Sequence, residues 1–152
     1  MNPSRLERAS PYAYALMRIV VGLLFACHGA QKLFGVLGGF GNQPGMVAPL
    51  FSLMGLAGLI EFIGGLLIAF GVLTPYVALL ASGEMAMAYF MRHFPRGFWP
   101  IENGGELAVL YCFVFLFIAA HGTGHWRVRQ SRALSEPAPM QKAEQQSKTL
   151  SE

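Results

Sequence analysis

The sequence predicts an all-α integral membrane protein, folded as a four-transmembrane-helix antiparallel bundle. Of its 152 residues, 54% are hydrophobic and only 12% are charged, which is about half the charged share of ordinary soluble domains. Four apolar segments follow one another along the chain, each close to the length of a membrane-spanning helix. Glycine, threonine and proline stand between them at positions typical of helix ends.

The first apolar segment runs from Ala13 to Phe34. It is longer than the hydrophobic region of a signal peptide, and Arg18 interrupts it where such a region is uncharged. We therefore interpret it as a membrane span and not as a cleaved signal. Arg18 shares a helical stripe with Gly22 and Gly29, and we expect it to contact helix C-terminal carbonyls or to reach the lipid headgroups.

The other apolar segments are Met54–Gly71, Tyr76–Met91 and Gly105–Ala120. At about 1.5 Å per residue, the last two are short for a hydrocarbon core of about 30 Å, so we expect them to extend by a few residues or to stand almost untilted. Gly71 is predicted to end the second helix, and Thr74-Pro75 to cap and begin the third. The second and third helices should then form a tight hairpin.

The connections and ends of the chain differ in composition from these segments. The stretch 34–53 carries five glycines and two prolines, so we expect a partly buried, re-entrant or interfacial loop. A second polar connection spans 92–104. The chain thus divides into an N-terminal cytoplasmic segment (1–12), a four-helix membrane domain (13–126) and a C-terminal tail (127–152), which is predicted to be disordered because it is polar and poor in aromatic residues.

The basic residues predict the orientation. An even number of helices places both termini on one side of the membrane, and five arginines flank the helices on that side: Arg5, Arg8, Arg127, Arg129 and Arg132. The opposite side carries Lys32, Arg92 and Arg96. The positive-inside rule then predicts a multi-pass protein in the bilayer of the bacterial inner (plasma) membrane, with both termini cytoplasmic. No stripe of basic and aromatic residues indicates a nucleic-acid partner.

Two glutamates lie within apolar segments, where an ionisable group costs several kcal/mol unless it is paired or hydrated. These are Glu61 and Glu84. Small residues flank them at helical spacing, which predicts that both lie on packing faces: Gly58, Gly65, Ala81 and Ala88. Each glutamate is about seven residues from the long-loop end of its helix, or roughly 10 Å deep. Antiparallel neighbours would therefore bring the two carboxyls to one level.

Further polar residues fall in the same half of the predicted bundle, so we predict a pocket there for a substrate or a proton. Its candidate residues are His28, Gln31, Lys32, Glu61, Glu84, Asn103 and Glu106. Lys32 could neutralise one glutamate, but two neighbouring carboxyls do not ionise together easily, so at least one is expected to exchange a proton near neutral pH. The same groups are also expected of a network that only locks the helices together. The sequence identifies no catalytic residue.

Histidine and cysteine spacing predicts no metal site. In His121-Gly-Thr-Gly-His125 the imidazoles are four residues apart, but the glycines work against a continuous helix and no carboxylate or cysteine follows nearby. His28 and His121 fall at opposite ends of the bundle, which argues against a haem between them. Cys27 and Cys112 lie in separate segments and are interpreted as small buried thiols. The many Met and Phe residues fit a core and lipid surface first, and a quinone-lining groove second.

Several short motifs follow one another in a characteristic order: Arg18 with Gly22, Gly29-Ala30-Gln31-Lys32-Leu33, Glu61-Phe62-Ile63-Gly64-Gly65 with Gly71, and Asn103-Gly104-Gly105-Glu106. Over 13–126 this series resembles the DoxX family of small bacterial membrane proteins. The resemblance implies a four-helix membrane bundle and, through DoxD-type relatives, quinone-linked oxidation of thiosulfate or quinol-like compounds. Other relatives resemble assembly factors. The family's closing Gly-x-Gly-x-x-Ser-x-Asp pattern is incomplete here, because the Ser and Asp are missing after Gly122-Thr-Gly124.

The leading functional hypothesis is a redox-associated membrane subunit that handles a quinone or a small reduced sulfur or quinol-like compound. The glutamates would carry protons, and Lys32 would stabilise an anion. No nucleotide, flavin or haem motif is present, so electrons would require a bound quinone, another cofactor or a membrane or soluble partner protein. The alternative is a non-enzymatic scaffold or assembly factor. A transporter or channel is a third reading that would require a homo-oligomer, since four helices enclose little space.

Overall fold

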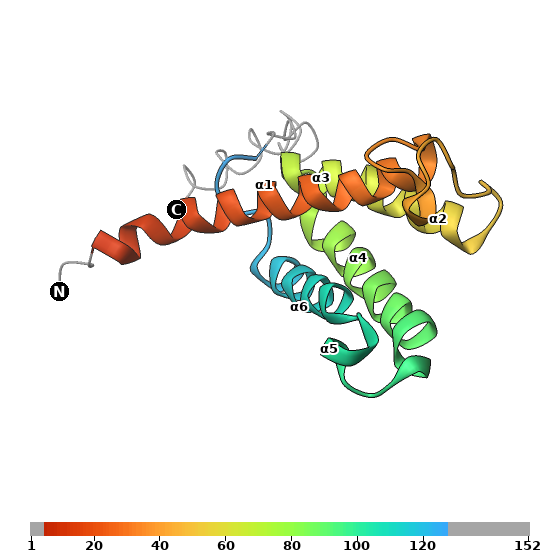
Figure 1. Ribbon diagram of the computed structural model, residues 1–152. Helices are drawn as coiled ribbons and strands as arrows, with labels where there is room; N and C mark the ends of the chain where they lie inside the picture. The colour runs from red at the N-terminus through yellow and green to blue at the C-terminus, as the bar shows by residue number, and fades with distance from the viewer. Residues whose placement is uncertain (1–4, 128–152) are drawn as a thin grey trace, which may run out of the picture.

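The computed structural model describes residues 5–127, and it contains only helices and no strands within that range (Figure 1). The predicted tail, apart from Arg127, lies outside the described residues. The all-α prediction is confirmed. The helical elements are α1 (Arg5–Phe34), η1 (Phe40–Asn42), α2 (Leu53–Leu59), η2 (Ile60–Gly64), α3 (Gly65–Phe70), α4 (Thr74–Ala88), η3 (Tyr89–His93), η4 (Phe94–Arg96), α5 (Pro100–Asn103) and α6 (Glu106–His121).

Two helical stretches in the described range are long and apolar enough to cross a membrane. They are Glu7–Phe34 and Leu53–Phe70, with mean hydropathies of 1.6 and 2.1. Glu106–His121 is apolar but shorter. The first two predicted segments are therefore candidate membrane spans, while the four-span antiparallel bundle stays a prediction.

α1 begins at Arg5, eight residues before the predicted start at Ala13. The extra turns begin with Arg5-Leu-Glu-Arg-Ala9, whose residue types favour helix, but the stretch is too polar to extend the apolar pattern. Pro11 lies inside the helix without ending it. The segment 1–12 is thus largely helical in the described part, and its place in the cytoplasm stays a prediction.

α1 packs closely against the continuous stretch formed by α2, η2 and α3. Glycines make this approach possible: a Cβ added to Gly22 would lie 2.7 Å from the carbonyl oxygen of Gly65, and one added to Gly29 would collide with the backbone at Phe62 and Gly58. Small residues allow such backbone proximity between membrane helices. The prediction that Gly58 and Gly65 lie on a packing face is confirmed.

The turn between α3 and α4 is one residue shorter than predicted, because α4 already begins at Thr74. Gly71 ends α3 in the left-handed conformation (φ 74°), as predicted. The expected cap at Thr74 is wrong, because Leu73 occupies the N-cap position with φ 49° and makes no side-chain cap bond. Its carbonyl accepts the N–H groups of Tyr76 and Val77, each at 3.1 Å. Helix therefore starts one residue early, and Thr74 becomes the first residue inside it.

α4 packs along α6, and the Ser82 hydroxyl on α4 donates to the carbonyl oxygen of Cys112 on α6 at 2.8 Å. The structure thus consists of two packed groups, α1 with α2–η2–α3, and α4 with α6. The completely buried side chains of Phe25, Ile68, Phe115 and Ile118 fill the space where the groups meet. α3 and η2 contact α4, whereas α2 diverges from it (Figure 1).

Arg18 joins three parts of the chain at the end of the molecule opposite α2. It is completely buried. Its Nη1 donates to the carbonyl oxygens of Ile68 and Ala69 in the last turn of α3, and its Nη2 donates to that of Trp126 at 2.7 Å. The predicted contact with helix C-terminal carbonyls is confirmed, and it places a cation where the helix dipole is negative.

Candidate functional site

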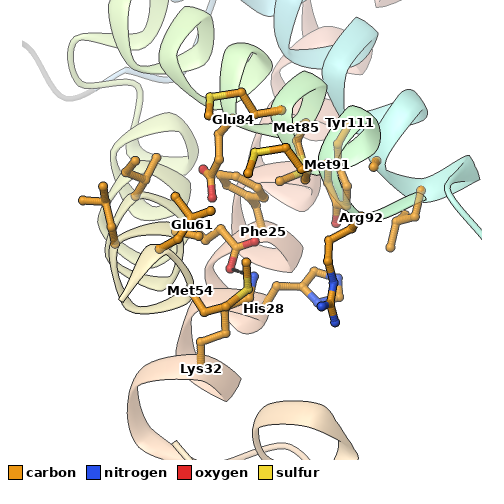
Figure 2. Close-up of a pocket in the computed structure, with 18 of the residues that line it drawn as sticks. Phe25, His28, Lys32, Met54, Glu61, Glu84, Met85, Met91, Arg92 and Tyr111 are labelled. Carbon is orange, nitrogen blue, oxygen red and sulfur yellow. Dashed lines mark hydrogen bonds and ion pairs between the residues drawn. The ribbon is translucent and has the colours of Figure 1, made fainter. Parts of the chain in front are cut away.

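A cavity of about 1170 Å³ lies between the two groups of helices (Figure 2). Its walls come from α1, α2, η2, α4 and α6, with the loop around η1 and the end of η3 at one side. Leucine, methionine and aromatic side chains form most of the lining, and a small number of polar groups interrupt it. The volume is somewhat above the roughly 300–1,000 Å³ typical of ligand pockets, and a lining of many apolar and few polar groups is typical of such pockets.

An ion pair crosses the cavity from α1 to η2. The ammonium of Lys32 donates to Oε2 of Glu61, whose side chain is only 4% exposed. Gly58 makes room for the lysine, since a Cβ at Gly58 would lie 2.9 Å from Cβ of Lys32. Glu61 also belongs to a π-helical turn, a local widening of the helix that often occurs at functional sites.

Glu84, on α4, presents a second carboxyl to the same space. Both of its oxygens are buried, and neither has a hydrogen-bond partner among residues 5–127. Figure 2 shows the carboxyl groups of Glu61 and Glu84 directed into the cavity near the Phe25 ring. Buried polar groups are nearly always hydrogen-bonded. An unpartnered carboxyl that lines a cavity therefore suits a ligand that supplies the missing partner.

The structure brings five of the seven candidate residues to this cavity: His28, Gln31, Lys32, Glu61 and Glu84. The imidazole of His28 lies 6.1 Å from the ring of Tyr111 and perpendicular to it. The amide nitrogen of Gln31 is used outside the cavity. It donates to the carbonyl oxygen of Leu37 at 2.6 Å and stabilises the loop after α1. Among these five, Lys32, Glu61 and Glu84 are the charged or acidic groups that line the cavity.

Asn103 does not line the cavity. It is buried, but its amide holds the loop before α6 together: Nδ2 donates to the carbonyl oxygen of Gly97 at 2.7 Å, and Oδ1 accepts the N–H of Gly105 at 2.8 Å. Nδ2 also contacts the hydroxyl of Tyr89 at 3.4 Å. Its hydrogen-bonding capacity is thus satisfied within the loop.

Glu106 is also absent from the cavity lining, although it starts α6 on the predicted side. The helix turns Leu107, Ala108 and Tyr111 toward the cavity. Because successive residues are about 100° apart around a helix, Glu106 lies outside the arc formed by these side chains and is exposed. The sequence correctly predicted that Glu106 lies at the start of α6, but it did not show which face of the helix Glu106 occupies.

Several lining residues were not among the candidates: Phe25, Met54, Met85, Met91, Arg92 and Tyr111. Tyr111 could have been found, because it is four residues from Leu107 on an apolar helix and carries the only hydroxyl on that face. The methionines have no such signal, since a methionine that lines a cavity and one that fills a core look alike in a sequence.

His121, Cys27 and Cys112 lie away from the groups that pair in the cavity. His121 is the last residue of α6, so the two imidazoles are not on one helix, as expected from Gly122. The His121 ring lies 4.0 Å from that of Tyr14. In the part of the chain that the structure describes, no three potential metal ligands gather. Cys27 is exposed and Cys112 is half-buried, so the interpretation as a buried thiol is wrong for Cys27, which faces outward from α1.

Comparison with known proteins agrees with the motif order. The DoxX family model matches residues 13–94, more than half of the chain, and this range contains Lys32, Glu61 and Glu84. A protein of Haemophilus influenzae described as uncharacterized is 40% identical over 124 residues, which cover 80% of this chain and 91% of that protein. No solved structure matches the chain. The chain belongs to the DoxX family.

Proposed function

We propose that this DoxX protein crosses the bacterial inner membrane four times, with both termini in the cytoplasm, and binds a quinone or a small reduced sulfur or quinol-like compound in its cavity. The observation that carries this proposal is the position of Glu84, an unpartnered buried carboxyl that faces a largely apolar cavity beside the Lys32–Glu61 ion pair. The third and fourth crossings would be α4 with η3, and α6.

The cavity has the properties that a quinone ring requires. Its carbonyl oxygens need hydrogen-bond donors, and its ring needs apolar walls. Among residues 5–127 no group is in hydrogen-bond contact with the Glu84 carboxyl, and a carboxylic acid at this position would have an O–H to donate to such an oxygen. The side chains of Phe25 and Met85 provide apolar contacts beside it. When bound, a quinone supplies the capacity to accept two electrons and two protons.

The residues of the chain would have separate tasks. Glu84 would hold a proton within reach of the bound molecule, while Lys32 would attract an anionic group and hold Glu61 in place. The lipid-facing helices would keep bulk water from the cavity centre. The sequence contains no nucleotide, flavin or haem motif, so the electrons would come from the reduced compound or from a redox partner protein in the membrane or beside it.

A scaffold or assembly role is the second candidate. It is favoured by the Lys32–Glu61 pair, in which each charge is already satisfied by the other, as expected of a structural lock. In that case the lipid-facing helices would pack against a larger complex or against further copies of the chain.

Purification from native membranes in mild detergent separates these proposals. If the cavity binds a quinone, solvent extraction of the wild-type protein and mass analysis should yield about one quinone per chain. Glu84→Leu should lose it while eluting as the same monodisperse peak, and Leu110→Phe, at an exposed position on α6 outside the cavity, should keep it. A stoichiometric protein partner without a bound small molecule would support the scaffold and contradict the redox proposal.

A further inference from the structure

The cavity is open between α2 and α4. Leu53 and Leu56 on α2, and Leu79, Leu80 and Met87 on α4, line the cavity and are also about half exposed on the outside of the molecule. A side chain that belongs to both surfaces marks the rim of an opening. Since α2 diverges from α4, the opening is a slot between two apolar helices. We call it the α2–α4 slot.

Gly83 widens the slot at the level of Glu84. It lines the cavity, follows Leu79 and Leu80 at helical spacing and is exposed. A Cβ built on Gly83 would meet no atom within 4 Å. This glycine therefore differs from Gly22 and Gly29, whose missing side chains admit a neighbouring helix. At Gly83 the missing side chain leaves empty space between the cavity and the outside.

The polar and apolar groups are separated across the cavity. Glu61 and Glu84 lie on its inner side near the buried Phe25 ring, while the rim of the slot consists of leucine, methionine and glycine. In a membrane, this rim would face lipid tails. A molecule that satisfies both sides has a polar head inside and an apolar chain that passes outward.

We propose that the cavity takes an amphiphile from the bilayer, with a hydrogen-bond-accepting head at Glu84 and an apolar chain that leaves through the α2–α4 slot beside Gly83. This inference rests on the proposed function and narrows its ligand to the lipid-soluble class. A small water-soluble anion is the competing ligand, because Arg92 and His93 line the cavity near its loop end and would attract such an anion from the aqueous side.

The test uses two probes with the same ring: decylubiquinone, which carries a ten-carbon chain, and ubiquinone-0, which carries none. Saturable binding above that of empty lipid nanodiscs is measured for the full-length wild type, Gly83→Phe and the control Leu110→Phe. We expect Gly83→Phe to weaken decylubiquinone binding about tenfold or more, because the phenyl ring obstructs the slot. Ubiquinone-0 binding should change less than about twofold, and the control should bind both probes as the wild type does.

Two results overturn the proposed chain path while leaving the quinone site intact: equal weakening of both probes by Gly83→Phe, or no weakening of either. Wild-type protein that binds neither probe but binds thiosulfate in equilibrium dialysis would overturn the lipid-soluble class and keep the small-compound form of the proposed function. Binding of none of the three would overturn both. If Gly83→Phe does not give a monodisperse peak, Leu79→Trp at the same slot replaces it, with the same expected results.

Discussion

At the scale of single residues, the site depends on two glutamates with different surroundings. Glu61 is paired with Lys32, whereas Glu84 has no partner among the described residues. The same side chain is thus a charged structural element on one helix and an open hydrogen-bonding group on the next. Substitution by glutamine, which keeps the shape but removes the charge and the acidic proton, should affect them differently.

Glu84→Gln should change the free energy of unfolding by less than about 1 kcal/mol, because an amide replaces a carboxyl that makes no hydrogen bond in the described structure. Glu61→Gln should destabilise the protein by roughly 1–3 kcal/mol, since it leaves Lys32 without its counter-charge; the partial exposure of the lysine keeps the loss below that of a fully buried pair. Thermal unfolding in detergent, followed by circular dichroism, measures both.

The double variant Lys32→Met, Glu61→Gln should regain most of the stability lost in Glu61→Gln, because no unpaired charge remains. Its thermal midpoint should therefore lie near that of the wild type. A Glu61→Gln variant that is already as stable as the wild type would contradict the role of the pair. If the double variant also retains the cellular phenotype of the gene, for example tolerance of quinone or sulfur stress, the pair acts only as a structural lock and the anion-attracting task proposed for Lys32 fails.

The sequence was sufficient to predict that Glu61 would lie on a packing face with Gly58 and Gly65 and that Lys32 would be available to a glutamate. It was not sufficient to separate Glu106 and Asn103 from the cavity. Their distance from it depends on the rotation of α6 and on hydrogen bonds within the loop before it. Neither the rotation of α6 nor these hydrogen bonds can be recognised from a periodic pattern in the sequence.

At the scale of helices, glycine has two opposite uses in this molecule. Gly29 lets α1 approach the backbone of η2, while Gly83 leaves the α2–α4 slot empty. Both stand within apolar helical sequence, and only the packing of the helices distinguishes them. The four apolar segments were thus predictable in order and approximate length. The divergence of α2 from α4 and the π-helical turn at Glu61 were not, because both result from tertiary packing.

Alanine substitutions should separate these two uses. Gly29→Ala should destabilise the protein by about 1–3 kcal/mol, because its Cβ meets the backbone of Phe62 and Gly58 and forces the helices apart. Gly83→Ala should be neutral or stabilise by up to about 1 kcal/mol, since alanine favours helix and meets no neighbour. Thermal midpoints in the same detergent measure the difference. Equal effects of the two substitutions would contradict the packing described here.

At the scale of the whole molecule, the proposed orientation places the loop around η1 outside the cytoplasm. With Cys27 and Cys112 replaced, Asn42→Cys should react with a membrane-impermeant thiol reagent in intact spheroplasts, because Asn42 is exposed in that loop. Ala9→Cys, exposed near the start of α1, should react only after lysis. The reverse pattern would invert the orientation and would leave the helix packing unaffected.

The hydrogen bonds of Arg18 must form in a fixed order during synthesis of the chain. A ribosome completes α1 before it reaches Ile68, which is 50 residues after Arg18, and Trp126, which is 108 residues after Arg18. Until those residues are made, the guanidinium lacks its final acceptors. It can move to its buried position only after α3 has formed, and its second nitrogen is satisfied only when the residues beyond α6 have left the ribosome. Burial of Arg18 is thus a late step of biogenesis. A nascent chain that stops before His125 would retain its helices, but Nη2 of Arg18 would lack its acceptors at this end of the molecule.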